Sequence, residues 1–340
     1  MQNSSYFIEN RALFGSFPKQ QHVDELVDRG VRYFVDLTQP DEARIVPYQV
    51  PNQCQKIKFP IRDHSVPRDW YTFSRFICQI SQLIQNMPNG HKMYVHCRGG
   101  HGRAGMVVSI LLGHICRLEP IDAMKKTSIF HSKRPSIKEK WKAIGSPHEY
   151  RQRAFVYRFF EPLTLHRIQY KSEYDNGFSR FSQHPILVNG KRYECVEGAL
   201  LSQMVEKYAV KTNVDFSMLT GKDAFLWRKN RWVNISRNLK CKEWEDSRRD
   251  VLHKLIRLKL KQHPEIKQKL LRSGLRKITM VARGNFTWPD GQGMNVTGTV
   301  LMKIRHELYL ASQTENDLNA AARVPVKCLN HTVEKSFRKS

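Results

Sequence analysis

Apolar residues in the first half of the chain are arranged as short buried strands separated by amphipathic helices. Continuous apolar runs at 31–37, 57–61 and 92–96 are typical of buried strands. Helical spacing at 19–29 places a helix before the first strand, and the spacing at 70–86 places another between the second and third. Strands that alternate with helices favour an α/β fold with a mainly parallel central sheet flanked by helices.

This first domain is expected to continue past the third strand and to end near residue 160. The apolar segment from Met106 to Cys116 has the length of a helix. Ser146 followed by Pro147 predicts the start of another helix, because serine caps a helix and proline suits its first turn.

The second half shows a different pattern, which predicts a mainly helical α+β domain. Asn-Gly between two β-prone runs at 184–196 indicates a hairpin. Apolar spacing predicts a basic helix at 242–262 and a last helix at 298–310. The expected organisation is therefore a first domain at 1–160, a linker at 161–173, a second domain at 174–313, and a polar tail at 314–340 whose composition is compatible with disorder.

The net positive charge of the chain indicates a further class of possible partners, the polyanions. The chain has 340 residues with 57 Lys and Arg against 31 Asp and Glu, a formal charge of +26. Residues 1–150 hold 21 basic and 13 acidic residues, a net +8, and the rest hold 36 and 18, a net +18. A basic surface attracts polyanions such as RNA, nucleotides or phosphorylated proteins. Solvated surface charge explains the same excess, so charge alone does not choose between these.

No apolar run approaches the length of a membrane span, and the first ten residues do not form a secretory signal, so we expect a cytoplasmic protein. The seven cysteines are scattered without a CxxC pair, which argues against a disulfide framework and a zinc site. The sequence predicts no metal and no other cofactor. It makes no prediction of oligomeric state.

The segment VHCRGGHGRAG at 95–105 lies between a predicted strand and a predicted helix, where backbone amides can converge on an anion. Cys97 at the helix N-terminus is expected as a thiolate that can attack phosphorus. Arg103 can grip two phosphate oxygens with its planar fork. The amides of the intervening residues would hold the other oxygens, and these residues form the expected substrate-binding set: Arg98, Gly99, Gly100, His101 and Gly102.

This segment resembles the HCxxGxxR loop of the cysteine-dependent tyrosine and dual-specificity phosphatases. The resemblance extends over about residues 10–160, and FPIRDHSVP resembles the general-acid loop of these enzymes. It implies that Asp63 protonates the leaving oxygen and later activates water. Asp69 on the same loop is the weaker candidate. Ala104 stands where most members have Ser or Thr, so slower breakdown of the phosphoenzyme is expected.

Arg98 and His101 are extra cationic candidates at the pocket mouth. Cations there would favour substrates with more than one phosphate, which keeps an RNA 5′-triphosphatase and a phosphoinositide phosphatase open. Side chains that face solvent would have no such effect.

Residues 174–310 resemble the NADAR family, on the stretches 178–198, 259–274 and 293–308 together with Trp288. Members are linked to cleavage of N-glycosidic bonds of ribose phosphates or ADP-ribosylated bases. The resemblance implies a possible second site, formed by Glu197, Lys259, Trp288 and Asn295.

Four positions depart from the NADAR pattern. Gly198 replaces the usual His, Met204 a common Lys, Met280 a frequent Glu, and Asn285 a frequent Asp. Loss of carboxylates removes charge that the reaction needs. We therefore expect a binding module or a degenerate enzyme.

The sequence as a whole predicts a cysteine-dependent phosphatase that works through a phosphocysteine, with phosphotyrosine or dual-specificity phosphoprotein substrates. Its catalytic residues would be Cys97, Arg103 and Asp63. The alternatives are an RNA 5′-triphosphatase, or a nucleotide- or RNA-binding protein whose second domain binds or cleaves ADP-ribose-type ligands.

Overall fold

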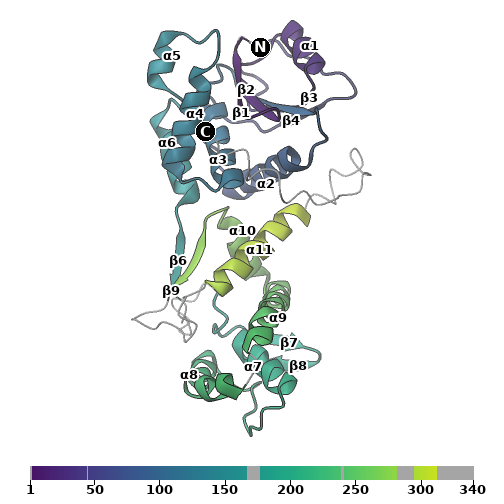
Figure 1. Cartoon of the computed structure of the whole chain (residues 1–340), viewed down its shortest axis with the longest axis vertical. Helices are drawn as coiled ribbons and strands as arrows, with labels where there is room; N and C mark the ends of the chain where they lie inside the picture. Colours follow the sequence, from purple (N-terminus) through teal and green to yellow (C-terminus); the bar gives the residue numbers. More distant parts are fainter. Residues whose placement is uncertain (1, 44, 167–176, 239–240, 282–294, 312–340) are drawn as a thin grey trace.

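The computed structural model describes residues 2–43, 45–166, 177–238, 241–281 and 295–311, which form two domains joined end to end (Figure 1). The first domain contains β1 (Ser4–Ile8), β2 (Ala12–Gly15), α1 (Gln20–Asp28), β3 (Val31–Asp36), β4 (Gln55–Lys58), α2 (Trp70–Asn86), β5 (Lys92–His96), α3 (Arg103–Cys116), α4 (Pro120–Ser132), α5 (Glu139–Ile144) and α6 (Tyr150–Phe160).

The central sheet of the first domain is mainly parallel, as predicted. Its strand order is β1-β2-β5-β3-β4, and only the β1–β2 pair is antiparallel. Alternate residues face opposite sides. Val35 and Val95 join the core formed with α2 and α3, whereas Phe34 and Tyr94 join the core under α1. Helices on both faces explain why the strands read as continuous apolar runs.

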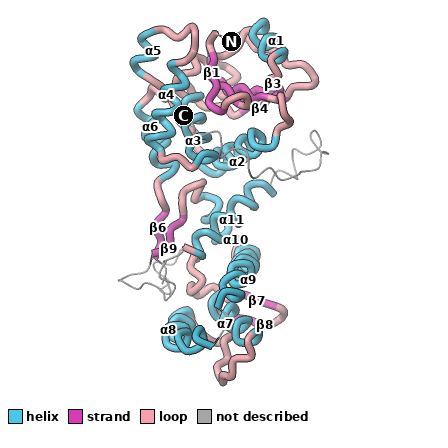
Figure 2. The backbone as a smooth tube through the Cα atoms, in the orientation of Figure 1, coloured by secondary structure: helices cyan, strands magenta, loops and turns pink. Residues whose placement is uncertain are grey.

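The second domain is mainly helical, as predicted, and its strands are short (Figure 2). It contains β7 (Ile186–Val188), β8 (Lys191–Tyr193), α7 (Val196–Lys207), α8 (Gly221–Asn238), α9 (Cys241–Gln262), α10 (Pro264–Arg272), β9 (Ile278–Val281) and α11 (Val296–Ala311). The predicted hairpin is present, and Asn189 and Gly190 at its turn both have positive φ, which Asn-Gly tolerates. The predicted tail at 314–340 lies outside the described residues.

Two sequence expectations are corrected. The helix predicted to begin at Ser146–Pro147 begins at Tyr150, because Ser146 instead donates a hydrogen bond from Oγ to the His101 carbonyl. The segment 161–173 is not only a linker. Its residues Leu163–His166 form β6, which pairs in parallel with β9.

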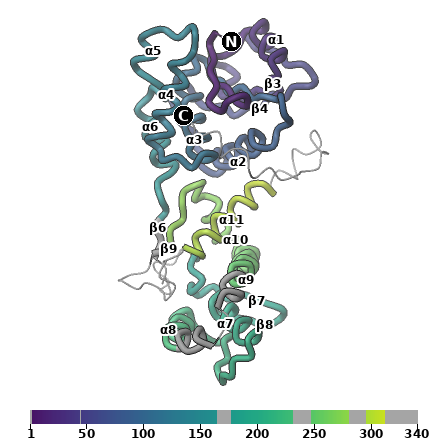
Figure 3. Tube along the Cα trace, in the orientation of Figure 1, coloured from purple at the N-terminus to yellow at the C-terminus, as the bar shows by residue number. Residues whose placement is uncertain are grey.

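The two domains meet along α2. Trp70 and Tyr71 at the start of α2 contact Arg276 and Tyr309 of the second domain, and Leu275 packs against the first domain's core. The colour gradient in Figure 3 shows the consequence, since the C-terminal helix α11 lies beside α2 from the first quarter of the chain. None of the described helices is long and apolar enough to cross a membrane.

Candidate active site

The loop between β5 and α3 curls tightly around the Cys97 sulfur. Cys97 is almost fully buried, and the Gly100 amide donates to its Sγ over 3.3 Å. Gly100 has a φ of +75°, and a β-carbon there would lie 2.4 Å from the backbone of Gly15. Only glycine fits this position, because the loop needs both the left-handed backbone and the close approach.

Arg103 at the start of α3 is held by two carboxylates. Its Nη1 and Nη2 each donate to one oxygen of Glu42 over 2.6 Å, and Nη1 also donates to the Ile61 carbonyl. Nη2 lies 2.9 Å from Asp63 Oδ1. The buried Nε has no hydrogen-bond partner among the described residues. An unpaired buried N–H is costly, so this donor is available to an incoming oxyanion.

The structure brings Asp63 to the loop and keeps Asp69 away from it. The Asp63 side chain is 36% exposed and also lies 3.8 Å from Arg98 Nη1. Asp69 instead caps α2, where it accepts from the amides of Tyr71 and Thr72. Its hydrogen bond from the Thr72 hydroxyl is the largest cause of its lowered pKa. Asp63 is therefore the carboxylate that can serve the Cys97 loop.

His96 supports the loop from beneath. The ring is fully buried, its Nε2 lies 2.7 Å from Tyr48 Oη, and its Nδ1 lies 3.9 Å from Asp36. Burial lowers the pKa of His96 to about 4. A neutral histidine whose ring is held by the Tyr48 hydroxyl adds no charge before Cys97.

The two extra cationic candidates differ. Arg98 is 44% exposed and lies beside Asp63 at the mouth of the site. His101 stacks on Trp141 with ring centroids 4.2 Å apart, and its Nδ1 lies 2.7 Å from His131 Nε2. Burial lowers the pKa of His101 to about 4, so its ring is neutral near pH 7. Burial therefore disfavours a charged ring at position 101.

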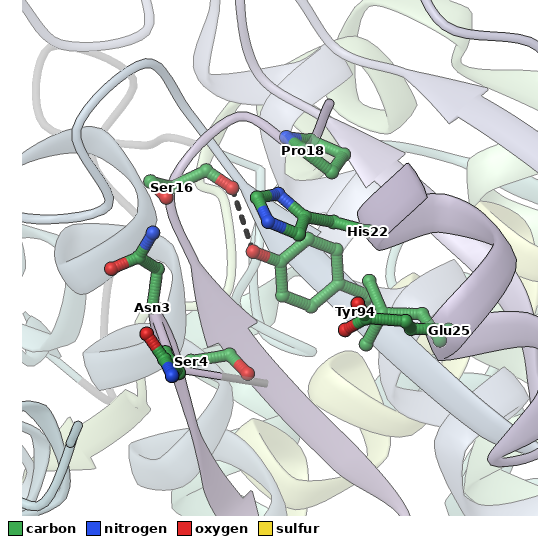
Figure 4. Close-up of a pocket in the computed structure, with 9 residues that line it drawn as sticks. Asn3, Ser4, Ser16, Pro18, His22, Glu25 and Tyr94 are labelled. Atoms are coloured by element: carbon green, nitrogen blue, oxygen red, sulfur yellow. Dashed lines mark hydrogen bonds between the residues drawn. The ribbon is translucent and has the colours of Figure 1, made fainter. Parts of the chain in front are cut away.

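Two cavities lie in the first domain. One, of about 290 Å³, is lined by Tyr94, whose hydroxyl donates to the Ser16 carbonyl, and by Glu25, and it contains none of the predicted site residues (Figure 4). The other, of about 190 Å³, reaches the loop itself at Gly99 and is also lined by Arg134. Arg134 is buried and donates to the Gly100 carbonyl.

The possible second site is closed by ion pairs. Glu197 is fully buried, with Arg180 Nε at 2.8 Å and Arg228 Nη1 at 2.7 Å. Burial alone would raise the pKa of Glu197, but the charges of Arg180 and Arg228 outweigh it, and the pKa is lowered. The two arginines therefore favour the ionised form of Glu197 and balance its charge.

Lys259 and Asn295 occupy different surroundings. Lys259 is buried and donates to the Ser179 carbonyl and to Ser182 Oγ, next to the arginine at 180. Asn295 donates from Nδ2 to the Ile278 carbonyl of β9. Trp288 lies outside the described residues.

Two of the four sequence departures in this domain lie in close packing, whereas the Met280 side chain and Asn285 lie outside the described part of the chain. A β-carbon at Gly198 would lie 2.6 Å from the Phe216 carbonyl oxygen, so the backbone excludes the histidine found in the family pattern. Met204 is buried in the core of the domain. These positions have become part of the packing.

Sequence reasoning missed Glu42, Arg134 and Tyr48, which position the loop from distant segments. Each sits in an irregular segment or at a helix end, with no motif around it. Only the fold brings them to Arg103, Gly100 and His96.

Comparison with known proteins finds two families in the chain. Residues 1–154 match the family described as "PTP-SAK: Swiss Army Knife protein, DSP-PTPase phosphatase domain", and residues 168–309 match the NADAR domain family. The predicted pairing of these two families is thereby confirmed.

Three relatives agree with this division. "Putative tyrosine phosphatase 197R" of Invertebrate iridescent virus 6 is 27% identical over 301 residues, 88% of this chain and 90% of the viral protein. "Putative tyrosine phosphatase 067L" of Invertebrate iridescent virus 3 is 33% identical over 183 residues, 53% of this chain and 74% of that protein. "N-glycosidase YbiA" of Shigella boydii serotype 4 (strain Sb227) is 31% identical over 147 residues, 42% of this chain and 87% of that protein.

Proposed function

The chain belongs to the DSP-PTPase phosphatase family through its first domain and to the NADAR family through its second, and we propose that it hydrolyses phosphomonoesters through a phosphocysteine at Cys97. The observation that carries this proposal is the combination of a buried Cys97 sulfur with the unpaired Nε of Arg103 on one loop. An oxyanion that accepts from this Nε completes the hydrogen bonding of the arginine.

The proposed reaction has two steps. The Cys97 thiolate donates an electron pair to phosphorus while the bond to the leaving oxygen breaks, and Asp63 gives that oxygen a proton. Asp63 then takes a proton from water, whose oxygen attacks the phosphocysteine and releases phosphate and thiolate. Arg103 and the loop amides hold the oxygens on which negative charge develops.

The substrates we propose are phosphotyrosine or dual-specificity phosphoproteins. Two relatives carry the name "Putative tyrosine phosphatase", which supports this class. The general acid is partly exposed and stands beside Arg98 at the surface, where a protein substrate could reach it.

One observation favours a second substrate class. The cavity that reaches Gly99 is lined by Arg134 and by the exposed Lys138, two cations next to the phosphate loop. A substrate with more than one phosphate, such as a 5′-triphosphorylated RNA, would place its further charge near them.

The test is phosphate release by wild type and Cys97→Ser from a phosphotyrosine peptide, a phosphothreonine peptide and 5′-triphosphorylated RNA, each at two salt concentrations. Cys116→Ser is the matched control, because this thiol lies at the opposite end of α3. We expect Cys97-dependent turnover of the peptides, with a loss on the order of 10⁴-fold or more in the serine variant. Turnover confined to RNA would establish the second class, and no turnover of any substrate would overturn the proposal.

For the second domain we propose binding of a ribose-phosphate ligand without cleavage. The support is that Glu197 is already neutralised by two arginines and that Gly198 cannot be replaced by histidine on this backbone. Calorimetric titration of the Cys97→Ser protein with ADP-ribose should show binding with no released product. Release of free ribose phosphate from an N-glycoside would contradict it.

A further inference from the structure

A cluster of three metal-ligating side chains lies where the two domains meet. Cys78 on α2 and His114 on α3 come from the first domain, and His306 on α11 comes from the second. The Cys78 sulfur and one ring nitrogen of each histidine all lie within 4.8 Å of one another. We propose that this cluster binds one zinc ion that joins the two domains.

The spacing fits a tetrahedral zinc site. Cys78 Sγ lies 3.6 Å from His306 Nδ1. Zinc–sulfur and zinc–nitrogen bonds of about 2.3 and 2.0–2.1 Å set a sulfur–nitrogen separation of about 3.5 Å in a tetrahedron. The pair therefore already stands at the separation that a shared ion requires, and the third ligand needs only a small side-chain movement.

The ligand types point to zinc. One thiolate and two imidazoles form a borderline-soft set that suits zinc better than magnesium or calcium, which prefer oxygen ligands. The thiol of Cys78 must lose its proton to bind, and the ion itself favours that loss.

The cluster is accessible to a cation from solvent, and two charged residues lie close to it. Cys78 is buried, His114 is half-buried and His306 is exposed, so the ion can arrive from solvent and keep a water as its fourth ligand. Arg305 is the nearby positive charge, but it is turned to Ser273 Oγ and the Arg276 carbonyl. Glu307, the next residue of α11, is ion-paired with Arg257 and lies within electrostatic range of His306.

The proposed ion would fix α2 against α11. The same contact is already lined by buried apolar residues, with Cys78 packed among Leu271 and Tyr309. A metal–ligand bond from each domain would therefore strengthen an existing interface.

A zinc titration of the full chain, made metal-free by a chelator and monitored with a chromophoric competitor, tests this proposal. Cys97→Ser is used as the background so that the loop thiol takes no metal. We expect one zinc per chain. Since loss of an outer partner alone costs about 10–100-fold in affinity, Cys78→Ala or His306→Gln should weaken binding by more than about 100-fold.

His148→Gln is the matched control, because His148 belongs to another group of possible ligands formed with His64 and Glu149. Zinc affinity that falls in His148→Gln and stays unchanged in His306→Gln would overturn the proposal. Equal, weak binding by all variants would overturn it too.

Folding measurements and spectroscopy distinguish the loss of a metal ligand from a general loss of structure. His306 is exposed, so His306→Gln should match the background protein in circular dichroism and in unfolding temperature without metal. Zinc should raise the unfolding temperature of the background protein and not of His306→Gln. Cobalt should give a thiolate charge-transfer band that disappears in Cys78→Ala, and a band that persists there would contradict the assignment.

Discussion

The Cys97 loop and the Glu197 cluster are both built from arginines and carboxylates, but in opposite proportions. In the first domain two carboxylates hold one arginine, Arg103, and leave its Nε unpaired beside a partly exposed Asp63. In the second domain two arginines enclose one carboxylate, Glu197, with no exposed surface. The first arrangement leaves a donor unpaired, whereas the second satisfies its own charge. This difference is the basis on which we propose an active site in the first domain and a structural cluster in the second.

The largest effect in this comparison should come from Asp63→Asn. A missing general acid lowers kcat by about 10²–10⁴-fold. The loss should be strong for phosphotyrosine peptide and much smaller for an aryl phosphate whose leaving oxygen needs no proton. Steady-state kinetics with both substrates check this. Asp69→Asn is the control, because asparagine can still cap α2 and position 69 lies away from the loop. Equal losses for both substrates would argue against the acid role.

Glu197→Gln should mainly damage stability. Removal of one partner from a buried ion pair costs about 3–5 kcal/mol, because Arg180 and Arg228 would stay buried without compensation. Denaturant unfolding measures this, with Glu194→Gln, a partly exposed pair with Arg192, as the control. Unchanged stability of Glu197→Gln would contradict a structural role for Glu197.

Glu197 should also make the free energy of unfolding depend on pH. The pKa of Glu197 is lowered in the folded protein, so its contribution to stability is present above the ordinary glutamate pKa of about 4.3 and is lost as the pH falls further. Wild type should therefore lose more stability than Glu197→Gln between pH 5 and 3.

Glu42→Gln should have a smaller effect, on catalysis. The glutamine cannot balance the charge of Arg103, so the guanidinium is held less firmly. We expect about a tenfold loss in kcat/KM, which corresponds to about 1.4 kcal/mol. Vanadate binding should weaken with it, and the exposed neighbour Asp41→Asn is the control. Tighter vanadate binding would instead mean that Glu42 competes with the substrate anion.

The smallest effect concerns His96, whose protonation should not change across the neutral range. Its folded pKa of about 4 lies below the ordinary value of about 6.5, so the ring stays neutral as the pH falls through 6. Imidazole nitrogen shifts measured by NMR between pH 7 and 5 should be constant. A titration midpoint near 6.5 would contradict burial as the controlling influence.

The sequence predicted the parts of the molecule that depend on local patterns. Helix α2 begins and ends as the apolar spacing at 70–86 indicates, and β5 matches the run at 92–96. The Cys97 loop could be read because all its parts lie within a few residues. Glu42, Arg134 and the Cys78–His114–His306 cluster could not, since their partners are separated by up to 228 residues along the chain.

Charge was the least informative signal. On the basic helix α9, Arg248 and Lys259 are buried, whereas Arg249, Lys254 and Lys261 are exposed. Composition cannot show which cations a fold turns inward.

The most direct test of the central claim is chemical trapping of the phosphocysteine. Wild type is mixed with an aryl phosphate, quenched in acid within milliseconds, digested and examined by mass spectrometry. The phosphatase resemblance implies a Ser or Thr at the position of Ala104 that would speed breakdown, so with alanine there the intermediate should accumulate. The account predicts one phosphoryl group on the peptide that contains Cys97 and none in Cys97→Ser. Turnover without that adduct, or an adduct on another residue, would contradict it.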